Sequence, residues 1–294
     1  MINLLEKYKQ YKVGIEGKNP KSIDDYIYRI QDFFDMFNIT NDENLINITA
    51  EDVQEWLLKL SNKGNSAQTR NAKLTAIKSI IKFLKDYKQF KIDENILKIK
   101  NAKVPKKEMR FLDKKEARAF IESITNQRTK AGAIISLTTG LRFSEMITLT
   151  VTDIKRKVAV IKGKGNKERT IYFTPYCLNI VEKYINKKRK HIIERYNIKS
   201  DLLFISDMGH LMRRDNYAIS LKHYAKKMGI DWASIMSPHK LRHSFASIKG
   251  EEGYDVTAIA DALGHESIAT TNRYLHAKQE RVRSMMESDS FASN

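Results

Sequence analysis

The sequence predicts a mainly α-helical, two-domain protein that contains one small β-sheet. Apolar residues recur at helical spacing through most of the 294-residue chain. Only two short runs, 158–161 and 170–173, have strand character, and they lie on either side of a turn. A basic stretch without apolar periodicity, 98–110, interrupts the helical pattern, and the length is about twice that of a typical domain. We therefore expect a helical domain over 1–100, a basic linker over 101–110 and a second domain over 111–294.

The predicted first domain is a set of helices, two of which have recognisable N-caps. Residues 23–37 carry a strong apolar stripe. Thr49 followed by Asp52 is typical of a capped helix start, and a further helix opens near Ser66. Four polar residues on or near the first exposed turns of that last helix are candidates for contacts in a DNA groove: Gln68, Thr69, Arg70 and Lys73. An ordinary solvated helix face carries the same residue types, so both interpretations stay open.

The charge balance indicates a polyanionic partner. The chain has a formal net charge of +18 and a pI near 9.7, which is more than solubility requires. Nucleic acid is the first candidate, and overuse of lysine on solvated faces is the alternative. Cys177 is the only cysteine, which excludes an intrachain disulfide and a multi-cysteine zinc site. No apolar run approaches the roughly 18 residues that cross a bilayer, so we expect a soluble, cytoplasmic protein without a membrane partner.

The predicted second domain begins with a capped helix and contains the β-hairpin. Asp113 and Glu116 have the spacing of a capping box. The two strand-like runs flank a glycine-rich basic tip that carries Lys164. The glycine spacing of this tip does not match a phosphate-binding loop, so no nucleotide site is predicted.

Residues 141–149 return to helical spacing after a glycine turn. They leave Arg142 facing outward beside Glu145. The arginine is a candidate for phosphate binding, but it could simply pair with Glu145 on the surface, a contact worth under about 1 kcal/mol.

Two stretches in the last third of the chain have the character of an active site. A helix is predicted to open after Pro238, and His239 and Arg242, three residues apart, project from one of its faces. Apolar residues line the opposite face. Downstream, a helix end with a glycine cap precedes an exposed His265. Tyr274 lies in a polar context that gives its hydroxyl group no evident core, so a phenol is displayed to solvent.

These segments together resemble the signature boxes of the tyrosine recombinases, closest to the bacterial Xer type. The segments are Thr139-Gly-Leu-Arg-Phe-Ser-Glu145, Gly163-Lys-Gly-Asn-Lys-Glu-Arg169, Pro238-His-Lys-Leu-Arg-His-Ser-Phe-Ala246 and Leu263-Gly-His265, with Tyr274 after them. The N-terminal helices also resemble the SAM-like core-binding domain of that family. The resemblance implies a C-shaped clamp on duplex DNA with inverted-repeat core sites. It further implies a homo-tetramer, or a hetero-tetramer with a paralogue, on the DNA.

The same residues suit phosphoryl transfer without a metal or other cofactor. Arg142 and Arg242 offer planar forks for the non-bridging oxygens of the transition state, and His265 can add a donor. Tyr274 is the only evident nucleophile, and its attack would leave a 3′-phosphotyrosyl bond and a free 5′-hydroxyl group. The bond energy is conserved, so religation needs no ATP. The resemblance assigns the general acid to Lys164, and it lets His239 accept the tyrosine proton or orient the phosphate.

Several functions remain compatible with this chemistry. We expect an Xer-like site-specific recombinase, which could act in chromosome partition by resolving chromosome dimers. The alternatives are a DNA integrase or resolvase of a small mobile element, a type IB topoisomerase-like relaxer, and a DNA-binding regulator that does not cut. After Tyr274, apolar residues at helix-like intervals within 276–291 require a groove, either on the same catalytic domain or on a neighbour's.

Overall fold

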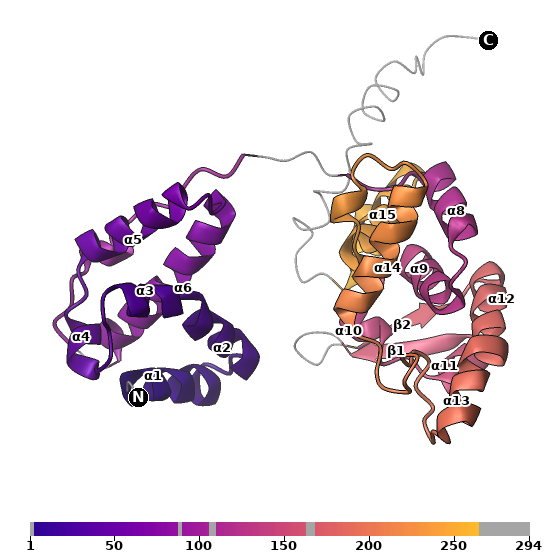
Figure 1. The fold of residues 1–294 in the computed structure, drawn as a ribbon, viewed down its shortest axis with the longest axis horizontal. Coiled ribbons are helices and arrows are strands. Elements are labelled where there is room, and N and C mark those ends of the chain that lie inside the picture. Colours follow the sequence, from indigo (N-terminus) through magenta and orange to yellow (C-terminus); the bar gives the residue numbers. More distant parts are fainter. Residues whose placement is uncertain (1–2, 88–89, 106–109, 163–167, 265–294) are drawn as a thin grey trace, which may run out of the picture. The chain divides into compact units, whose positions relative to one another are not determined.

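The computed structural model describes residues 3–87, 90–105, 110–162 and 168–264. The predicted fold class is confirmed, because helices and a single antiparallel hairpin make up the regular structure in these ranges (Figure 1). The chain divides into two compact units, residues 1–107 and 108–294, and each has its own hydrophobic core.

The first unit is entirely helical within the described residues. Its elements are α1 (Asn3–Gln10), the π-helix η1 (Tyr11–Ile15), α2 (Pro20–Arg29), α3 (Gln31–Met36), α4 (Asp42–Ile46), α5 (Ala50–Asn62), α6 (Ala67–Asp86) and α7 (Asn95–Lys98). The capping box predicted at Thr49 and Asp52 is confirmed at the start of α5, and Ser66 caps α6 as predicted. The apolar stripe over 23–37 is divided between α2 and α3, because the backbone leaves helical geometry at Ile30.

The core of the first unit forms around the aromatic rings of α3 and α5. The rings of Phe33 and Trp56 meet edge-on at 5.2 Å, and both residues are fully buried. On α6, Asn71 exchanges two hydrogen bonds of 2.8 Å with the backbone of Ala102. The chain after α7 is therefore still hydrogen-bonded to α6 at Ala102.

The second unit contains the hairpin and the remaining helices. Its elements are α8 (Lys114–Ser123), α9 (Gln127–Thr139), α10 (Phe143–Met146), α11 (Val151–Arg156), β1 (Val158–Lys162), β2 (Glu168–Tyr172), α12 (Pro175–Tyr184), the π-helix η3 (Ile185–Arg189), α13 (Lys190–Tyr196), α14 (Arg214–Lys227), the 3₁₀-helix η4 (Ala233–Ile235), α15 (Pro238–Glu251) and α16 (Val256–Leu263). β1 and β2 pair antiparallel with Val160 opposite Thr170, as the hairpin prediction requires. Asp113 and Glu116 form the predicted capping box of α8.

The buried helix α9 organises the second unit. It packs against α12 and α15, and most of its residues are buried. It ends at Gly140 in the left-handed conformation, with φ of 65°. A Cβ atom at this position would lie 2.5 Å from the Phe245 ring and 2.7 Å from the Leu263 side chain. The close approach packs the C-terminal ends of α9 and α16 against the middle of α15.

Two helical segments differ from their sequence predictions. The helix expected over residues 141–149 is only the short α10, because Arg142 has extended backbone and turns follow Met146. The lysine-rich sequence of residues 177–196 predicts a helix on the surface. It is instead α12, η3 and α13 in succession, with a face that buries Val181 and Tyr184 against the core.

Candidate active site

Arg142 lies where the chain leaves α9. It is the N-cap residue of α10, and its side chain is 40% exposed. Its Nη1 donates to Glu145 Oε1 at 2.8 Å, and its Nη2 donates to the carbonyl oxygen of Gly264 at 3.2 Å. The guanidinium is therefore held by protein groups on one side and remains open to solvent on the other.

Arg242 lies in the first turns of α15 and is almost completely buried, with a side chain 4% exposed. Its Nη1 donates to the carbonyl oxygen of Gly140 at 2.8 Å, and its Nη2 donates to that of Leu263 at 2.7 Å. These two carbonyl groups belong to the C-terminal ends of α9 and α16, where backbone acceptors lack helical partners. The helix ends thereby fix the direction of the guanidinium.

His239 precedes Arg242 by three residues on α15, and the residue as a whole is exposed. Partial burial of its ring and the positive charges of Arg242, Arg214 and Lys240 lower the pKa of His239. Its ring contacts that of His243 edge-on at 4.0 Å. A histidine in this setting is neutral at physiological pH and can exchange a proton with a substrate group.

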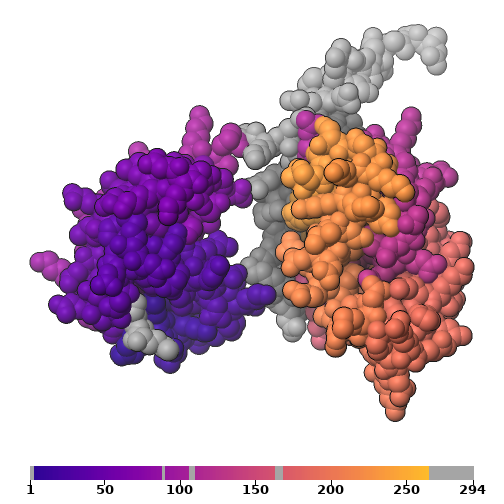
Figure 2. Space-filling view, in the orientation of Figure 1, coloured from indigo at the N-terminus to yellow at the C-terminus, as the bar shows by residue number. Residues whose placement is uncertain are grey.

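Arg142, His239 and Arg242 line one small hollow of about 200 Å³ on the second unit. The complete lining is Arg142, Phe143, Ser144, Arg214, Pro238, His239 and Arg242. Helices α14 to α16, orange to yellow in Figure 2, form one continuous face of this unit. The three arginines and the histidine bring guanidinium and imidazole donors to one hollow, and such donors are suited to bind a phosphate group.

Glu145 is buried, whereas its spacing from Arg142 allows a simple surface pair. Its side chain is only 8% exposed, so its carboxylate does not form an ordinary pair on the surface. Arg169, the last residue of the hairpin motif, forms two hydrogen bonds with it, of 2.7 Å and 3.1 Å. Burial raises the pKa of the Glu145 carboxyl, but the hydrogen bonds from Arg169 and Arg142 outweigh burial and hold this pKa below its ordinary value. Helical spacing placed Glu145 beside Arg142, but no local pattern shows that β2 folds over the same carboxylate.

Three predicted site residues lie outside the described residues: Lys164, His265 and Tyr274. The structure describes the chain on both sides of Lys164 and as far as Gly264, directly before His265. Gly264 is the left-handed C-cap of α16, as the glycine-cap prediction requires.

The four predicted DNA contacts on α6 differ in their surroundings. Gln68 and Thr69 are exposed in the first turn. Arg70 donates to the backbone of Asn65, and Lys73 pairs with Asp32 at 2.7 Å. The Thr69 hydroxyl is also hydrogen-bonded, to Ser66 Oγ at 2.9 Å, so the Gln68 amide is the freest of the four side chains to contact a ligand.

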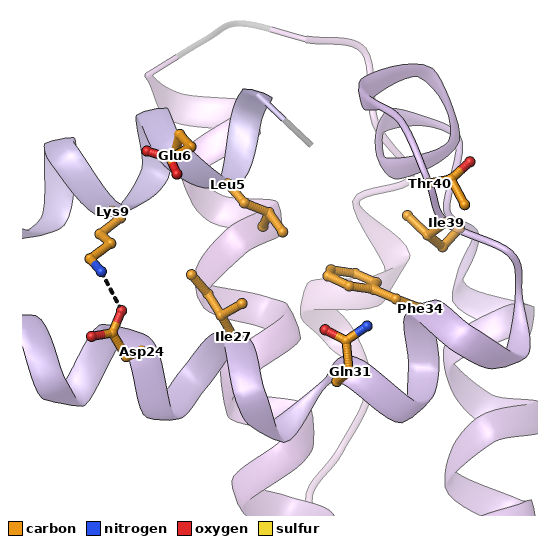
Figure 3. Close-up of a pocket in the computed structure, with 9 residues that line it drawn as sticks. All are labelled: Leu5, Glu6, Lys9, Asp24, Ile27, Gln31, Phe34, Ile39 and Thr40. Atoms are coloured by element: carbon orange, nitrogen blue, oxygen red, sulfur yellow. Dashed lines mark ion pairs between the residues drawn. The ribbon is translucent and has the colours of Figure 1, made fainter. Parts of the chain in front are cut away.

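A second hollow, of about 380 Å³, lies wholly within the first unit. Leu5, Ile27 and Phe34 point into it, and the Lys9–Asp24 ion pair lies at its edge (Figure 3). None of the residues predicted for chemistry lines this hollow.

Neither a metal site nor a membrane span is found in the described part of the chain. No group of three or more His, Cys, Asp or Glu side chains there could hold an ion. None of its helices combines the length and apolar character needed to cross a bilayer.

Family models match both units. The model described as "Phage integrase family" matches residues 110–281, which is more than half of the chain. The chain belongs to the phage integrase family of tyrosine recombinases. The model described as "Phage integrase, N-terminal SAM-like domain" matches residues 5–88. The predicted family membership is therefore confirmed.

Curated relatives and solved structures agree with this assignment. Tyrosine recombinase XerA of Pyrococcus horikoshii is 29% identical over 292 residues, which cover 97% of this chain and 93% of that protein. Tyrosine recombinase XerD of Oceanobacillus iheyensis is 31% identical and covers 82% of each chain. XerH bound to its palindromic difH substrate has a TM-score of 0.70 at 22% identity, over 97% of this chain and 83% of that one. The Tn1549 transposon integrase in complex with circular intermediate DNA has a TM-score of 0.72 at 19% identity, over 98% and 100%. The two solved structures establish similarity of fold.

Proposed function

We propose that this tyrosine recombinase cleaves and rejoins duplex DNA at specific sites, with Tyr274 as the nucleophile. The observation that carries the proposal is the hollow lined by Arg142, Arg242 and His239. The two arginines are also hydrogen-bonded to the C-terminal end of α16. Tyr274 lies eleven residues after Leu263, the last residue of α16. The two curated relatives described above are Xer recombinases, which favours an Xer-like role.

The arginines supply the charge stabilisation. In the pentacoordinate transition state, negative charge accumulates on the non-bridging oxygens of the phosphate. Arg242 is already fixed by two backbone carbonyl groups, so it needs little reorganisation when the phosphate enters. Arg142 faces the same hollow with exposed donors, and the His265 side chain can add another.

Proton transfer completes the reaction. Tyr274 must lose a proton to attack, and a neutral His239 can accept it or orient the phosphate. The departing 5′-oxygen needs a proton, which Lys164 can supply. The products are a 3′-phosphotyrosyl bond and a 5′-hydroxyl group, and the same steps in reverse join a new strand.

The test is covalent trapping. Adducts between the protein and its host genome are mapped to identify the target site, and duplexes carrying that site are used for kinetics. Tyr274→Phe should bind these duplexes normally but form no adduct, and wild-type cleavage should persist in EDTA. Arg242→Ala should raise the free-energy barrier to cleavage by several kcal/mol. It should have little effect on DNA binding, because many other cations contact the DNA backbone. Adduct formation by the Phe variant would refute the nucleophile assignment.

We further propose that four protomers assemble on two DNA sites through the C-terminal tail. The second unit carries an apolar groove of about 390 Å³ whose floor includes Ile121, Ile134 and Leu137. The tail contains Val282, Met285, Met286 and Phe291 at helix-like intervals, which suits such a groove. If each tail docks in the neighbouring protomer of a ring, the position of each Tyr274 is coupled to the adjacent protomer. Truncation after Ala277 should preserve binding to a single site but abolish cooperative binding and strand exchange.

A further inference from the structure

We propose that Arg169 is a positioning residue that keeps Arg142 and Arg242 available for the phosphate, a role that rests on the function proposed above. Arg169 belongs to β2, and its side chain is only 12% exposed. It does not line the hollow that holds the two other arginines. It therefore acts on the substrate through its neighbours.

The first neighbour is Glu145. Both Nη atoms of Arg169 donate to this carboxylate, at 3.1 Å to Oε1 and 2.7 Å to Oε2. The same carboxylate accepts from Arg142 and lies 3.9 Å from Nη1 of Arg242. One buried negative charge is thus shared by three guanidinium groups.

Removal of Arg169 would change this sharing. The lone pairs that Arg169 now occupies would turn to Arg142 and Arg242, because a buried carboxylate requires compensation. A guanidinium drawn toward Glu145 is drawn away from the phosphate. Arg169 thus occupies hydrogen-bond acceptor positions of the Glu145 carboxylate. The carboxylate can then orient Arg142 and Arg242 without drawing them away from the phosphate.

The second neighbour is the C-terminal end of α16. Three successive carbonyl groups there accept from three different arginines: Ala262 from Arg169 at 3.0 Å, Leu263 from Arg242 at 2.7 Å and Gly264 from Arg142 at 3.2 Å. Positive groups are favourable at this end of a helix. The guanidinium of Arg169 also lies close to Gly264, where its Nη1 would be 2.9 Å from an added Cβ atom. Arg169 therefore fixes the helix end against which the other two guanidinium groups are aligned.

Arg128 provides a matched control in the same unit. Its side chain is 15% exposed, and it also joins a carboxylate to a backbone carbonyl group, those of Asp207 and Ile205. It does not line the phosphate hollow. Arg128→Met therefore removes a similar set of contacts without affecting the arginines of the site.

The experiment measures single-turnover cleavage of the mapped target duplex by the full-length protein. Two substrates are compared, one with an ordinary scissile phosphate and one with a methylphosphonate that lacks the negative charge. We expect Arg169→Met to slow cleavage of the phosphate substrate about tenfold to a hundredfold, with unchanged DNA affinity. The defect should shrink on the methylphosphonate, because the neutral group depends less on Arg142 and Arg242. Arg128→Met should cleave both substrates at nearly the wild-type rate.

An equal defect on both substrates, or cleavage by Arg169→Met within about twofold of wild type, would overturn the inference. If Arg169→Met does not fold, Arg169→Lys replaces it. Lysine keeps the charge but loses the fork, so the same dependence on the substrate should appear in weaker form. Absence of cleavage by the wild-type protein would instead refute the proposed function, so the two failures are distinguishable.

Discussion

The substitution Glu145→Gln tests whether the buried carboxylate stabilises the second unit. It removes the charge that compensates Arg169 and Arg242, whose side chains are 12% and 4% exposed. Loss of one partner from a buried ion pair costs about 3–5 kcal/mol, and the amide oxygen can still accept one hydrogen bond, which favours the lower end. For a unit of this size, a loss of about 3 kcal/mol lowers the melting temperature by about 10 °C.

Asp207→Asn is the matched control for this measurement. Asp207 also pairs with two cations, Arg128 and Lys188, but its side chain is 55% exposed. Because exposed pairs contribute under about 1 kcal/mol, its melting temperature should fall by no more than about 3 °C. Thermal denaturation followed by circular dichroism near neutral pH compares the two variants with wild type.

The same experiment has a pH dependence with a definite sign. The pKa of Glu145 is below its ordinary value of 4.5, so the folded state holds the carboxylate ionised more strongly than the unfolded state does. This contribution is fully present above the unfolded pKa and is lost as the pH falls through the folded pKa. The difference between wild type and Glu145→Gln should therefore narrow below about pH 4.5. A Glu145→Gln protein that melts like wild type, or like Asp207→Asn, would refute the reasoning.

Three further predictions concern the packing, the histidine and the first unit. Gly140→Ala should destabilise the second unit by more than about 1 kcal/mol, because the added methyl group meets Phe245 and Leu263. Gly64→Ala, at a similar positive φ but with open space around it, should destabilise the protein less, and thermal melting curves of the two variants compare the losses. Lys240→Gln removes a positive charge that lowers the pKa of His239, so the acid limb of the pH profile of the cleavage rate should move to higher pH. The control Lys249→Gln breaks an exposed pair with Glu252 and should leave this pH profile unchanged. Residues 111–294 alone should bind DNA more weakly and with a shallower salt dependence than the whole chain, and equal slopes in a titration would show that the first unit makes no phosphate contacts.

Local patterns in the sequence were sufficient for the fold class and for several helix starts. The boxes at Thr49 and Asp113 and the hairpin strands depend on residues close together in the chain, so spacing alone could predict them. The break at Ile30 and the shortness of α10 could not be predicted in this way, because tertiary packing overrides apolar periodicity there.

At the site, the burial of Glu145 could not be predicted from its neighbours in the sequence. Its carboxylate is covered by Arg169, which is 24 residues away, and lies 3.9 Å from Arg242, which is more distant still in the sequence. A charged residue three positions from an arginine has the pattern of a surface pair whether or not other elements cover it. The pairing of Arg242 with two helix ends also depends on contacts distant in sequence.

The hydrogen bonds at the end of α16 link two equilibria. Arg142 donates to the carbonyl oxygen of Gly264, and the same guanidinium faces the hollow proposed for the phosphate. If phosphate binding draws donors of Arg142 away from this carbonyl group, the C-terminal end of α16 loses a hydrogen bond in the same step. The two binding events are then coupled. If phosphate binding changes the affinity of the end of α16 for a contact by some factor, that contact changes the affinity for the phosphate by the same factor. A partner that contacts the C-terminal end of α16 would thus change substrate affinity without touching the DNA.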